Sequence, residues 1–177
     1  QAMALIKHRY PEAVENTCVA IIGGDPWSDN PDAEMARLQA MRQDLGIHDF
    51  VLFLGAKDQD VLPNYYAAAE MVIMPSHYES FGMVALEAMA MARPVIASEV
   101  GGLAYLVQDG VTGYHVPTRD PEALAEKIYE LLSNPDCRED MGRAARRFAE
   151  RFDWHIIAQR MVTTYETLVA ANQNQDF

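Results

Sequence analysis

The sequence lacks any hydrophobic run long enough to span a membrane. Half of its 177 residues are hydrophobic, yet no stretch approaches the roughly 18 consecutive apolar residues that a transmembrane helix needs. The N-terminus also lacks the basic start and the small-residue cleavage site of a secretory signal. Length and composition therefore predict one domain with a full hydrophobic core and no membrane-spanning segment.

Basic residues are scarce compared with acidic ones. Lys and Arg total 14 against 26 Asp and Glu, which gives a net charge of −12. Nucleic-acid binding requires a basic face that meets phosphates, so this charge argues against it. Any site for an anionic ligand has to rely on local donors, because the field of the whole molecule repels the ligand.

Cysteine and paired histidine are also scarce. Cys18 and Cys137 lie far apart without metal-ligand spacing, which fits a reducing cytoplasm as the location. Because Cys18 leads into an apolar run, we expect its thiol to be buried. The five histidines are scattered and no two are spaced i, i+4, so no metal site is expected.

Short, unbroken apolar runs alternate with stretches of helical periodicity. Runs that do not alternate polar with apolar residues are typical of strands covered on both faces, as in a parallel sheet. This order predicts an α/β fold with a doubly wound, Rossmann-like parallel sheet. We expect strands at 19–22, 51–54, 71–74, 95–97 and 113–116, and helices at 31–45, 59–69, 81–91, 101–108, 121–133, 136–150 and 154–171.

The beginning of the chain does not fit the usual order of this fold. A doubly wound half-domain opens with a strand and a Gly-rich turn, whereas this sequence opens with a helical pattern over 2–10, whose Met3, Ile6 and Tyr10 share one face, and without an initiator Met. We expect the first strand to lie upstream, in a longer parent protein. Residues 1–177 then form a single domain that ends in the helix at 154–171.

The segment 75–88 carries the candidate chemistry. An apolar strand ends at Met74, a polar loop follows, and a helix starts near Gly82, at the carboxyl edge of the sheet where open α/β folds bind ligands. The first free amides of that helix, from Gly82, Met83 and Val84, are expected to form an anion site that the helix dipole strengthens. Gly82 also lets a diphosphate approach the backbone, because it has no Cβ. Such backbone donors allow phosphate binding in a negatively charged protein.

Two glutamates bracket this anion site. Glu79 precedes the helix, and Glu87 lies inside it, roughly 7 Å along the axis from the helix start. A carboxylate accepts hydrogen bonds from vicinal hydroxyls, so one glutamate fits a sugar and the other a ribose, at either end of a nucleotide sugar. Two glutamates at this spacing also occur by chance, and a lone helical Glu usually faces solvent. The apolar neighbours of Glu87, however, make a carboxylate there costly unless it has partners.

The run Glu79-Ser-Phe-Gly-Met-Val-Ala-Leu-Glu87 resembles the Glu-x7-Glu signature of group 1 (family 4) glycosyltransferases. These are retaining enzymes with two Rossmann-like domains that face a cleft, the glycosyltransferase B-type fold. The likeness covers essentially the whole chain as the C-terminal, donor-binding domain. It departs from the family at Ala92-Arg93 and Ala104-Tyr105. Further segments that resemble the family in order and spacing are 93–98, 100–103, 109–116 and 152–154.

The resemblance implies a role for each candidate residue. Glu79 would contact the donor sugar at the catalytic position, Glu87 would contact the ribose, and the amides of Met83 and Val84 would meet the diphosphate. Lys57 follows a strand in the segment that matches the nucleobase loop, although a solvated loop lysine is an equal alternative. The implied donor-binding set is Gly23, Lys57, Leu62, Glu79, Ser80, Phe81, Gly82, Met83, Val84 and Glu87.

Two glycine pairs are ambiguous in the sequence. Gly23-Gly24 and Gly101-Gly102 either line the cleft or form plain tight turns. The turn at Gly23-Gly24 also lacks the Gly-x-Gly-x-x-Gly spacing of a dinucleotide-dependent oxidoreductase.

The resemblance also implies the ligand and the partners. The donor would be a nucleoside-diphosphate sugar, with a UDP-sugar expected first, and transfer would need neither a cofactor nor a metal. The family's diphosphate-neutralising Arg and Lys lie upstream of this region, and its acceptor site and a histidine near the reacting sugar belong to an N-terminal domain. That domain would carry any peripheral membrane contact, and the present segment alone is expected to be inactive. A sugar-nucleotide epimerase and a non-catalytic nucleotide-sugar-binding module are the alternatives.

Overall fold

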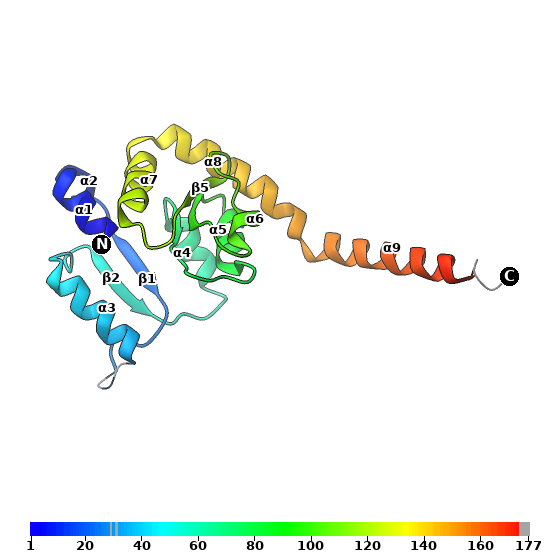
Figure 1. The fold of residues 1–177 in the computed structure, drawn as a ribbon, viewed down its shortest axis with the longest axis horizontal. Helices are drawn as coiled ribbons and strands as arrows, with labels where there is room; N and C mark the ends of the chain where they lie inside the picture. Colours follow the sequence, from blue (N-terminus) through cyan, green and yellow to red (C-terminus); the bar gives the residue numbers. More distant parts are fainter. Residues whose placement is uncertain (29, 31, 174–177) are drawn as a thin grey trace.

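The computed structural model describes residues 1–28, 30 and 32–173 as an α/β domain from which one long helix projects (Figure 1). All the expected strands form, with ends within one residue of those predicted. They are β1 (Val19–Ile22), β2 (Val51–Gly55), β3 (Val72–Met74), β4 (Val95–Ser98) and β5 (Gly113–Val116).

The helices follow the predicted alternation with the strands. The helix at 2–10 is confirmed over Ala2–Arg9, with Met3 and Ile6 buried. The short α2 that follows it was not expected from the sequence; its first residue is Pro11, a residue that suits the first helical position. The described helices are α1 (Ala2–Arg9), α2 (Pro11–Val14), α3 (Ala33–Asp44), α4 (Leu62–Ala68), α5 (Met83–Ala90), α6 (Leu103–Leu106), α7 (Pro121–Ser133), α8 (Pro135–Ala149), the 3₁₀ turn η1 (Glu150–Phe152) and α9 (Trp154–Gln173).

The strands pair in parallel, but the expected single sheet is divided. β1 pairs with β2, with Val19 opposite Val51. A separate sheet has the order β3-β4-β5, with Val95 opposite Gly113. Among the described residues, no strand of the first sheet is paired with β3, β4 or β5.

Helices cover both faces of the central strand β4, all of which is buried. Because successive side chains of a strand point to opposite faces, Ile96 packs into one apolar cluster with residues of α1 and α7, while Val95 and Ala97 pack into another with residues of α5 and α8. The prediction of strands covered on both faces is therefore confirmed for β4. Parallel strands in such a layer direct their carboxyl ends to one edge, where the loops are free to carry a site.

Capping residues begin both helices that follow β5. The side chain of Asp120 accepts a hydrogen bond from the amide of Ala123 at 3.0 Å, ahead of Pro121 in α7. The side chain of Asn134 accepts one from the amide of Cys137 at 3.1 Å, ahead of Pro135 in α8. A polar N-cap followed by Pro satisfies the free amides of a first turn.

Two observations concern the surface. Cys18 is exposed, so the expectation of a buried thiol is wrong; the residue precedes β1 rather than lying within it. Within the described part of the chain, no helix combines the length and the apolar character that crossing a membrane requires.

Candidate functional site

The predicted anion site lies where β3 ends and α5 begins. β3 ends at Met74, the loop 75–82 follows, and α5 starts at Met83. Gly82 has a φ of +98°, which a residue with a Cβ rarely adopts. A Cβ at this position would also lie 2.9 Å from the side chain of Leu103 on α6. Backbone conformation and close packing thus both require glycine here.

Glu79 organises this loop through its own carboxylate. Its Oε1 accepts hydrogen bonds from the amides of Gly82 at 3.1 Å and Phe81 at 3.3 Å. The expectation that the Gly82 amide is free is therefore wrong, because a carboxylate three residues earlier reaches it. Among the described residues, no acceptor is recorded for the amides of Met83 and Val84, as is usual for the first amides of a helix.

The Gly101-Gly102 turn supports the loop from the neighbouring strand β4. The amide of Gly102 donates to the carbonyl oxygen of Glu79 at 3.0 Å. A Cβ at Gly101 would lie 1.8 Å from that same oxygen, and one at Gly102 would lie 2.2 Å from the carbonyl oxygen of Phe81. The two glycines therefore permit a close backbone contact, which accounts for them without a ligand.

Glu87 is held by a residue of another helix. The hydroxyl of Tyr66 on α4 donates to Glu87 Oε2 at 2.8 Å. Glu87 is half-buried, and the ring of Tyr66 is buried in the apolar cluster beneath α5. The partnered carboxylate that the apolar neighbours of Glu87 predict is thus present, with a partner 21 residues earlier in the chain.

The remaining predicted residues lie at the carboxyl ends of β1 and β2 and at the start of α4. The amide of Gly23 donates to the carbonyl oxygen of Gly55 at 3.0 Å, which joins the two strand ends. The Nζ atom of Lys57 lies 5.8 Å from the centroid of the Trp27 ring. Leu62 packs against the apolar cluster that also contains Tyr66 and α5 residues. In the described region, no recorded hydrogen bond or ion pair joins Gly23 or Lys57 to either glutamate.

Apolar side chains surround the start of α5. Phe81 packs edge-on against Phe152 of η1, with ring centroids 6.1 Å apart. Met83 and Val84 are exposed, as is Ser80. Within the predicted segment from Glu79 to Val84, four residues are therefore accessible, whereas Gly82 is buried and Glu79 is half-buried.

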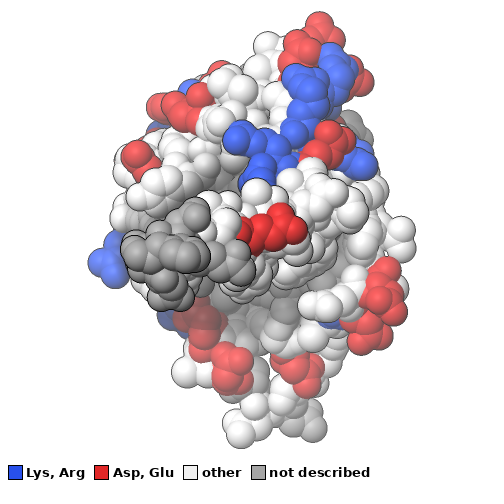
Figure 2. Space-filling model, turned by 90° about the vertical axis from the view of Figure 1, so that its right-hand side faces the viewer, with Lys and Arg blue, Asp and Glu red and all other residues white. Residues whose placement is uncertain are grey.

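Basic side chains are concentrated on α8 and η1. Figure 2 shows Lys and Arg collected in one zone of the viewed face, at the height of α8 in Figure 1. On α8, Arg146 donates to the carbonyl oxygen of Ala90, at the end of α5 opposite the candidate anion site. Local charge at the predicted site thus comes from the helix amides, with Lys57 as the one basic side chain in the predicted set. Five of the 14 Lys and Arg residues lie on α8 and η1: Arg138, Arg143, Arg146, Arg147 and Arg151.

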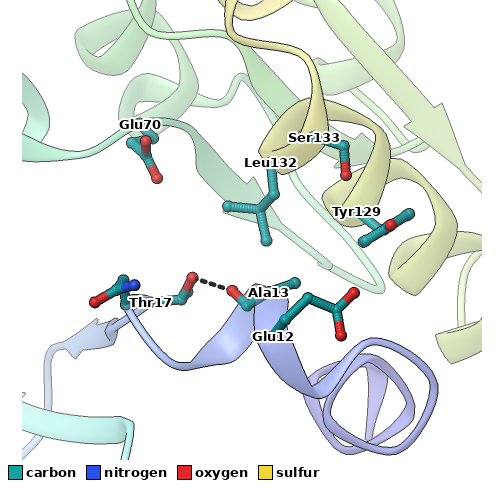
Figure 3. Close-up of a pocket in the computed structure, with 8 residues that line it drawn as sticks. Glu12, Ala13, Thr17, Glu70, Tyr129, Leu132 and Ser133 are labelled. Carbon is teal, nitrogen blue, oxygen red and sulfur yellow. Dashed lines mark hydrogen bonds between the residues drawn. The ribbon is translucent and has the colours of Figure 1, made fainter.

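A cavity of about 300 Å³ lies elsewhere, beside the amino ends of β1 and β3 (Figure 3). It lies between α2 and the end of α7, with Thr17 before β1 and Glu70 before β3 among its lining residues. Glu12 also lines it, and none of its described lining residues is basic. This cavity is therefore poorly suited to a diphosphate, and we keep the carboxyl edge as the candidate site.

Two residues at the site were missed by the sequence reasoning. Tyr66 has no motif that distinguishes it from its neighbour Tyr65, and only the packing of α4 on α5 identifies it. Trp27 is 70 % exposed beside Lys57 and Gly55. An exposed Trp next to a glycine turn was the one signal available, because large aromatic residues are usually well buried.

No His, Cys, Asp or Glu cluster of three or more that suits a metal occurs in residues 1–28, 30 and 32–173.

Comparison with known proteins identifies the family. Residues 1–148 match the family described as "Glycosyl transferases group 1". The chain belongs to this family. It is 38 % identical over 167 residues to a D-inositol 3-phosphate glycosyltransferase from Kribbella flavida, and the match covers 94 % of this chain and 39 % of the relative. The chain thus spans about two fifths of the length of the curated relatives it matches.

Solved structures of other proteins share the fold. A sucrose-phosphate synthase from Thermosynechococcus elongatus superposes with a TM-score of 0.81 at 38 % identity, covering 96 % of this chain and 41 % of that one. HepE from Anabaena, in complex with UDP and glucose, superposes with a TM-score of 0.77 at 27 % identity, covering 93 % and 42 %. The fold of this chain is therefore that of one half of a B-type glycosyltransferase.

Proposed function

We propose that this group 1 chain is the donor-binding domain of a retaining glycosyltransferase that takes a nucleoside-diphosphate sugar. The observation that carries the proposal is the arrangement at α5. Two amides without a recorded acceptor in the described part of the chain, from Met83 and Val84, lie in the segment between Glu79 and Glu87 that follows the carboxyl end of β3. The complex of HepE with UDP and glucose favours a UDP-sugar as the donor.

Each part of the donor has a proposed contact. The amides of Met83 and Val84 bind the diphosphate and stabilise the negative charge that it gains as the glycosidic bond breaks. Glu79 orients the sugar through Oε2, since Oε1 is bound to the loop amides. Glu87 accepts a ribose hydroxyl, and the segment that contains Gly55 and Lys57 receives the base. Positioning rather than nucleophilic attack is the role of Glu79 in this proposal.

The acceptor belongs to a second domain in this proposal. The curated relatives are about two and a half times as long as the matched region, and we place the acceptor site and the basic residues that neutralise the donor diphosphate in that additional length. Any peripheral contact with a membrane would also be made there. The cytoplasmic location suggested by the sequence stays a prediction.

The sheet order supports one further strand in the longer protein. A classic doubly wound sheet has the order 3-2-1-4-5-6. If β1 to β5 are taken as strands 2 to 6 of that order, β2-β1 lies on one side of strand 1 and β3-β4-β5 lies on the other. We therefore propose that a strand outside the 177 residues pairs between β1 and β3.

Calorimetric titration of the chain with UDP, GDP and ADP tests the donor role. We expect Glu87→Ala to weaken binding of the preferred nucleotide about 10-fold or more, because it removes a hydrogen bond to a charged group. Glu166→Ala, an exposed change on α9, serves as the matched control and should leave the affinity unchanged. An unaltered affinity in Glu87→Ala would contradict the proposal, and no turnover is expected from this chain alone.

A further inference from the structure

Tyr66 is a buried aromatic residue whose polar atom points out of the core. Its side chain is 9 % exposed, and its ring packs with Ala85, Ala88 and Met89 on the inner face of α5. Its hydroxyl leaves this apolar cluster and donates to Glu87 Oε2 at 2.8 Å. A phenylalanine would fill the same apolar space, so packing alone does not account for the hydroxyl.

The hydrogen bond joins equivalent positions of two helices. Tyr66 is four residues into α4, and Glu87 is four residues into α5, so each lies about 6 Å along its helix axis from the helix start. α4 follows the end of β2, where Gly55 and Lys57 lie, and α5 starts at the candidate phosphate site. The shared carboxylate therefore links the helix that follows the proposed base segment to the helix that starts at the proposed diphosphate amides. In any nucleotide, the ribose lies between the base and the phosphates.

The hydrogen bond engages only one of the two oxygens of the Glu87 carboxylate. Oε2 accepts from Tyr66, and within the described residues no donor is recorded for Oε1. A hydrogen bond from a neutral donor to a carboxylate also limits rotation of the glutamate side chain, whose three torsions otherwise allow many orientations. The unoccupied oxygen is thereby held in one direction.

The donor stays protonated over the whole working range of pH. Burial, followed by the hydrogen bond and charge of Glu87, raises the pKa of Tyr66 well above its ordinary value. The hydroxyl therefore donates to the carboxylate under all conditions in which nucleotide binding is measured.

We propose that Tyr66 is a positioning residue that aims Glu87 Oε1 at a ribose hydroxyl, and that this pair sets the preference of the site for ribose over deoxyribose nucleotides. The inference rests on the proposed nucleotide-sugar function and adds the residue that makes Glu87 selective. Tyr66 itself does not touch the nucleotide.

The test compares ribonucleotide with deoxyribonucleotide binding. Calorimetric titration measures Kd for UDP, GDP and ADP, and then for the 2′-deoxy form of whichever binds most tightly. In the unchanged chain we expect the 2′-deoxy form to bind about 10-fold more weakly, as expected for a hydrogen bond to a charged group. In Tyr66→Phe we expect ribonucleotide affinity to fall about 3- to 10-fold, with little change for the deoxy form, so that the preference nearly disappears.

A matched control and a second variant keep the comparison secure. Tyr65→Phe removes a hydroxyl from the adjacent residue of the same helix, for which no side-chain hydrogen bond is recorded in the described part of the chain, and should preserve the preference. Thermal unfolding checks that each variant is folded. Tyr66→Met also removes the hydroxyl while a flexible side chain refills the cluster, so the result does not depend on one substitution.

The outcomes separate the two proposals. In the Glu87→Ala background, adding Tyr66→Phe should have no further effect on binding, because the oxygen that it positions is gone. If Glu87→Ala weakens ribonucleotide binding but Tyr66→Phe and Tyr66→Met keep the full ribose preference, the positioning role is overturned and the proposed function stands. If the unchanged chain binds none of the three nucleotides, the proposed function fails and the positioning role fails with it.

Discussion

At the scale of single residues, the loop before α5 depends on backbone contacts that only glycine permits. Gly101 has a φ of +46°, and a Cβ there would lie 1.8 Å from the Glu79 carbonyl oxygen. We expect Gly101→Ala to lower the free energy of unfolding by about 2 kcal/mol or more, since both backbone strain and a clash oppose it. Urea denaturation measures the change, and nucleotide titration should show weaker binding because Glu79 is displaced.

Gly46 provides the control for backbone conformation alone. Its φ is +62°, and a Cβ at this position would meet nothing within 4 Å. Gly46→Ala should therefore cost only about 1 kcal/mol, the penalty of the left-handed region itself. Equal losses in the two variants would show that the close contact with Glu79 does not matter.

The residue scale is also where the sequence was least informative. Both glutamates were identified from their spacing and setting, but the sequence did not show that Glu79 binds the amide of Gly82 or that Glu87 binds Tyr66. These contacts depend on the orientation of the loop and on how α4 packs against α5, and no local pattern encodes either. Cys18 was misjudged for a similar reason, because its exposure depends on where β1 begins.

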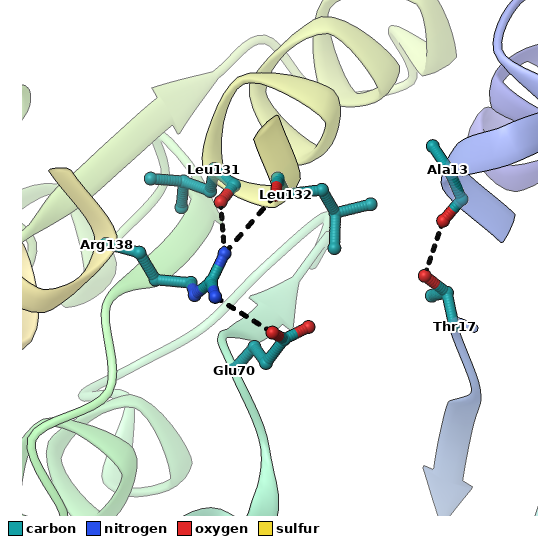
Figure 4. Close-up of polar contacts among 6 residues, drawn as sticks. All are labelled: Ala13, Thr17, Glu70, Leu131, Leu132 and Arg138. Atoms are coloured by element: carbon teal, nitrogen blue, oxygen red, sulfur yellow. Dashed lines mark hydrogen bonds and ion pairs between the residues drawn. The ribbon is translucent and has the colours of Figure 1, made fainter. Parts of the chain in front are cut away.

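At the scale of elements, one side chain links three segments of the chain. Arg138, in the first turn of α8, donates to the carbonyl oxygens of Leu131 at 2.6 Å and Leu132 at 3.4 Å, and to Glu70 at 2.9 Å (Figure 4). It thus satisfies carbonyls at the end of α7 and holds α8 beside Glu70, which lies two residues before β3. Its side chain is only 18 % exposed.

We expect Arg138→Met to lower the free energy of unfolding by about 1–2 kcal/mol, because it removes a helix C-terminal cap from a largely desolvated position. Arg143→Met, on the same helix, removes only exposed ion pairs with Glu139 and Asp140 and should cost less than about 0.5 kcal/mol. Chemical denaturation of both variants gives the comparison. A loss in Arg143→Met as large as that in Arg138→Met would contradict the capping role.

A carboxylate also joins α7 to β5. Lys127 and then Tyr114 donate to Glu130, and these hydrogen bonds lower the pKa of the Glu130 carboxyl below its ordinary value. A lowered folded-state pKa gives stabilisation that is present above the unfolded-state pKa and is lost as the pH falls through the folded-state value. Because the side chain is 43 % exposed, we expect an effect of only about 0.5 kcal/mol.

Glu130→Gln should therefore be less stable than the unchanged chain at pH 7, and the difference should shrink as the pH is lowered from 5 to 3. Urea denaturation at several pH values measures it. Glu126→Gln, an exposed change on the same helix, should show no such pH dependence. A difference that grows on acidification would reverse the assigned sign.

Most elements were predictable because their signals are local. Unbroken apolar runs predicted the five strands, and helical periodicity predicted α7 and α8 to within one residue at either end. The apolar runs do not specify which strands pair, because strand pairing is a long-range property. α2 was missed because a four-residue helix carries too little periodicity to detect.

At the scale of the whole molecule, the compact part of the chain and α9 differ in how they are stabilised. α9 extends away from the rest of the domain (Figure 1). Apolar side chains along it remain accessible, with Met161 at 50 % and Leu168 at 57 % exposed. A helix that buries so little of itself contributes little to the core on the opposite side of η1.

We therefore expect removal of residues 154–177 to leave the compact part folded. The loss in stability should be below about 1 kcal/mol, which corresponds to a fall in Tm of less than about 4 °C for a domain of this size. Leu131→Ala, a cavity-forming change at a fully buried position, should cost about 2–5 kcal/mol and shows that the assay detects core damage. Calorimetry measures Tm, and far-ultraviolet circular dichroism should show the lost helix. A cooperative collapse of the shortened chain, or a loss as large as that of Leu131→Ala, would mean that α9 is part of the folding unit rather than an appendage to it.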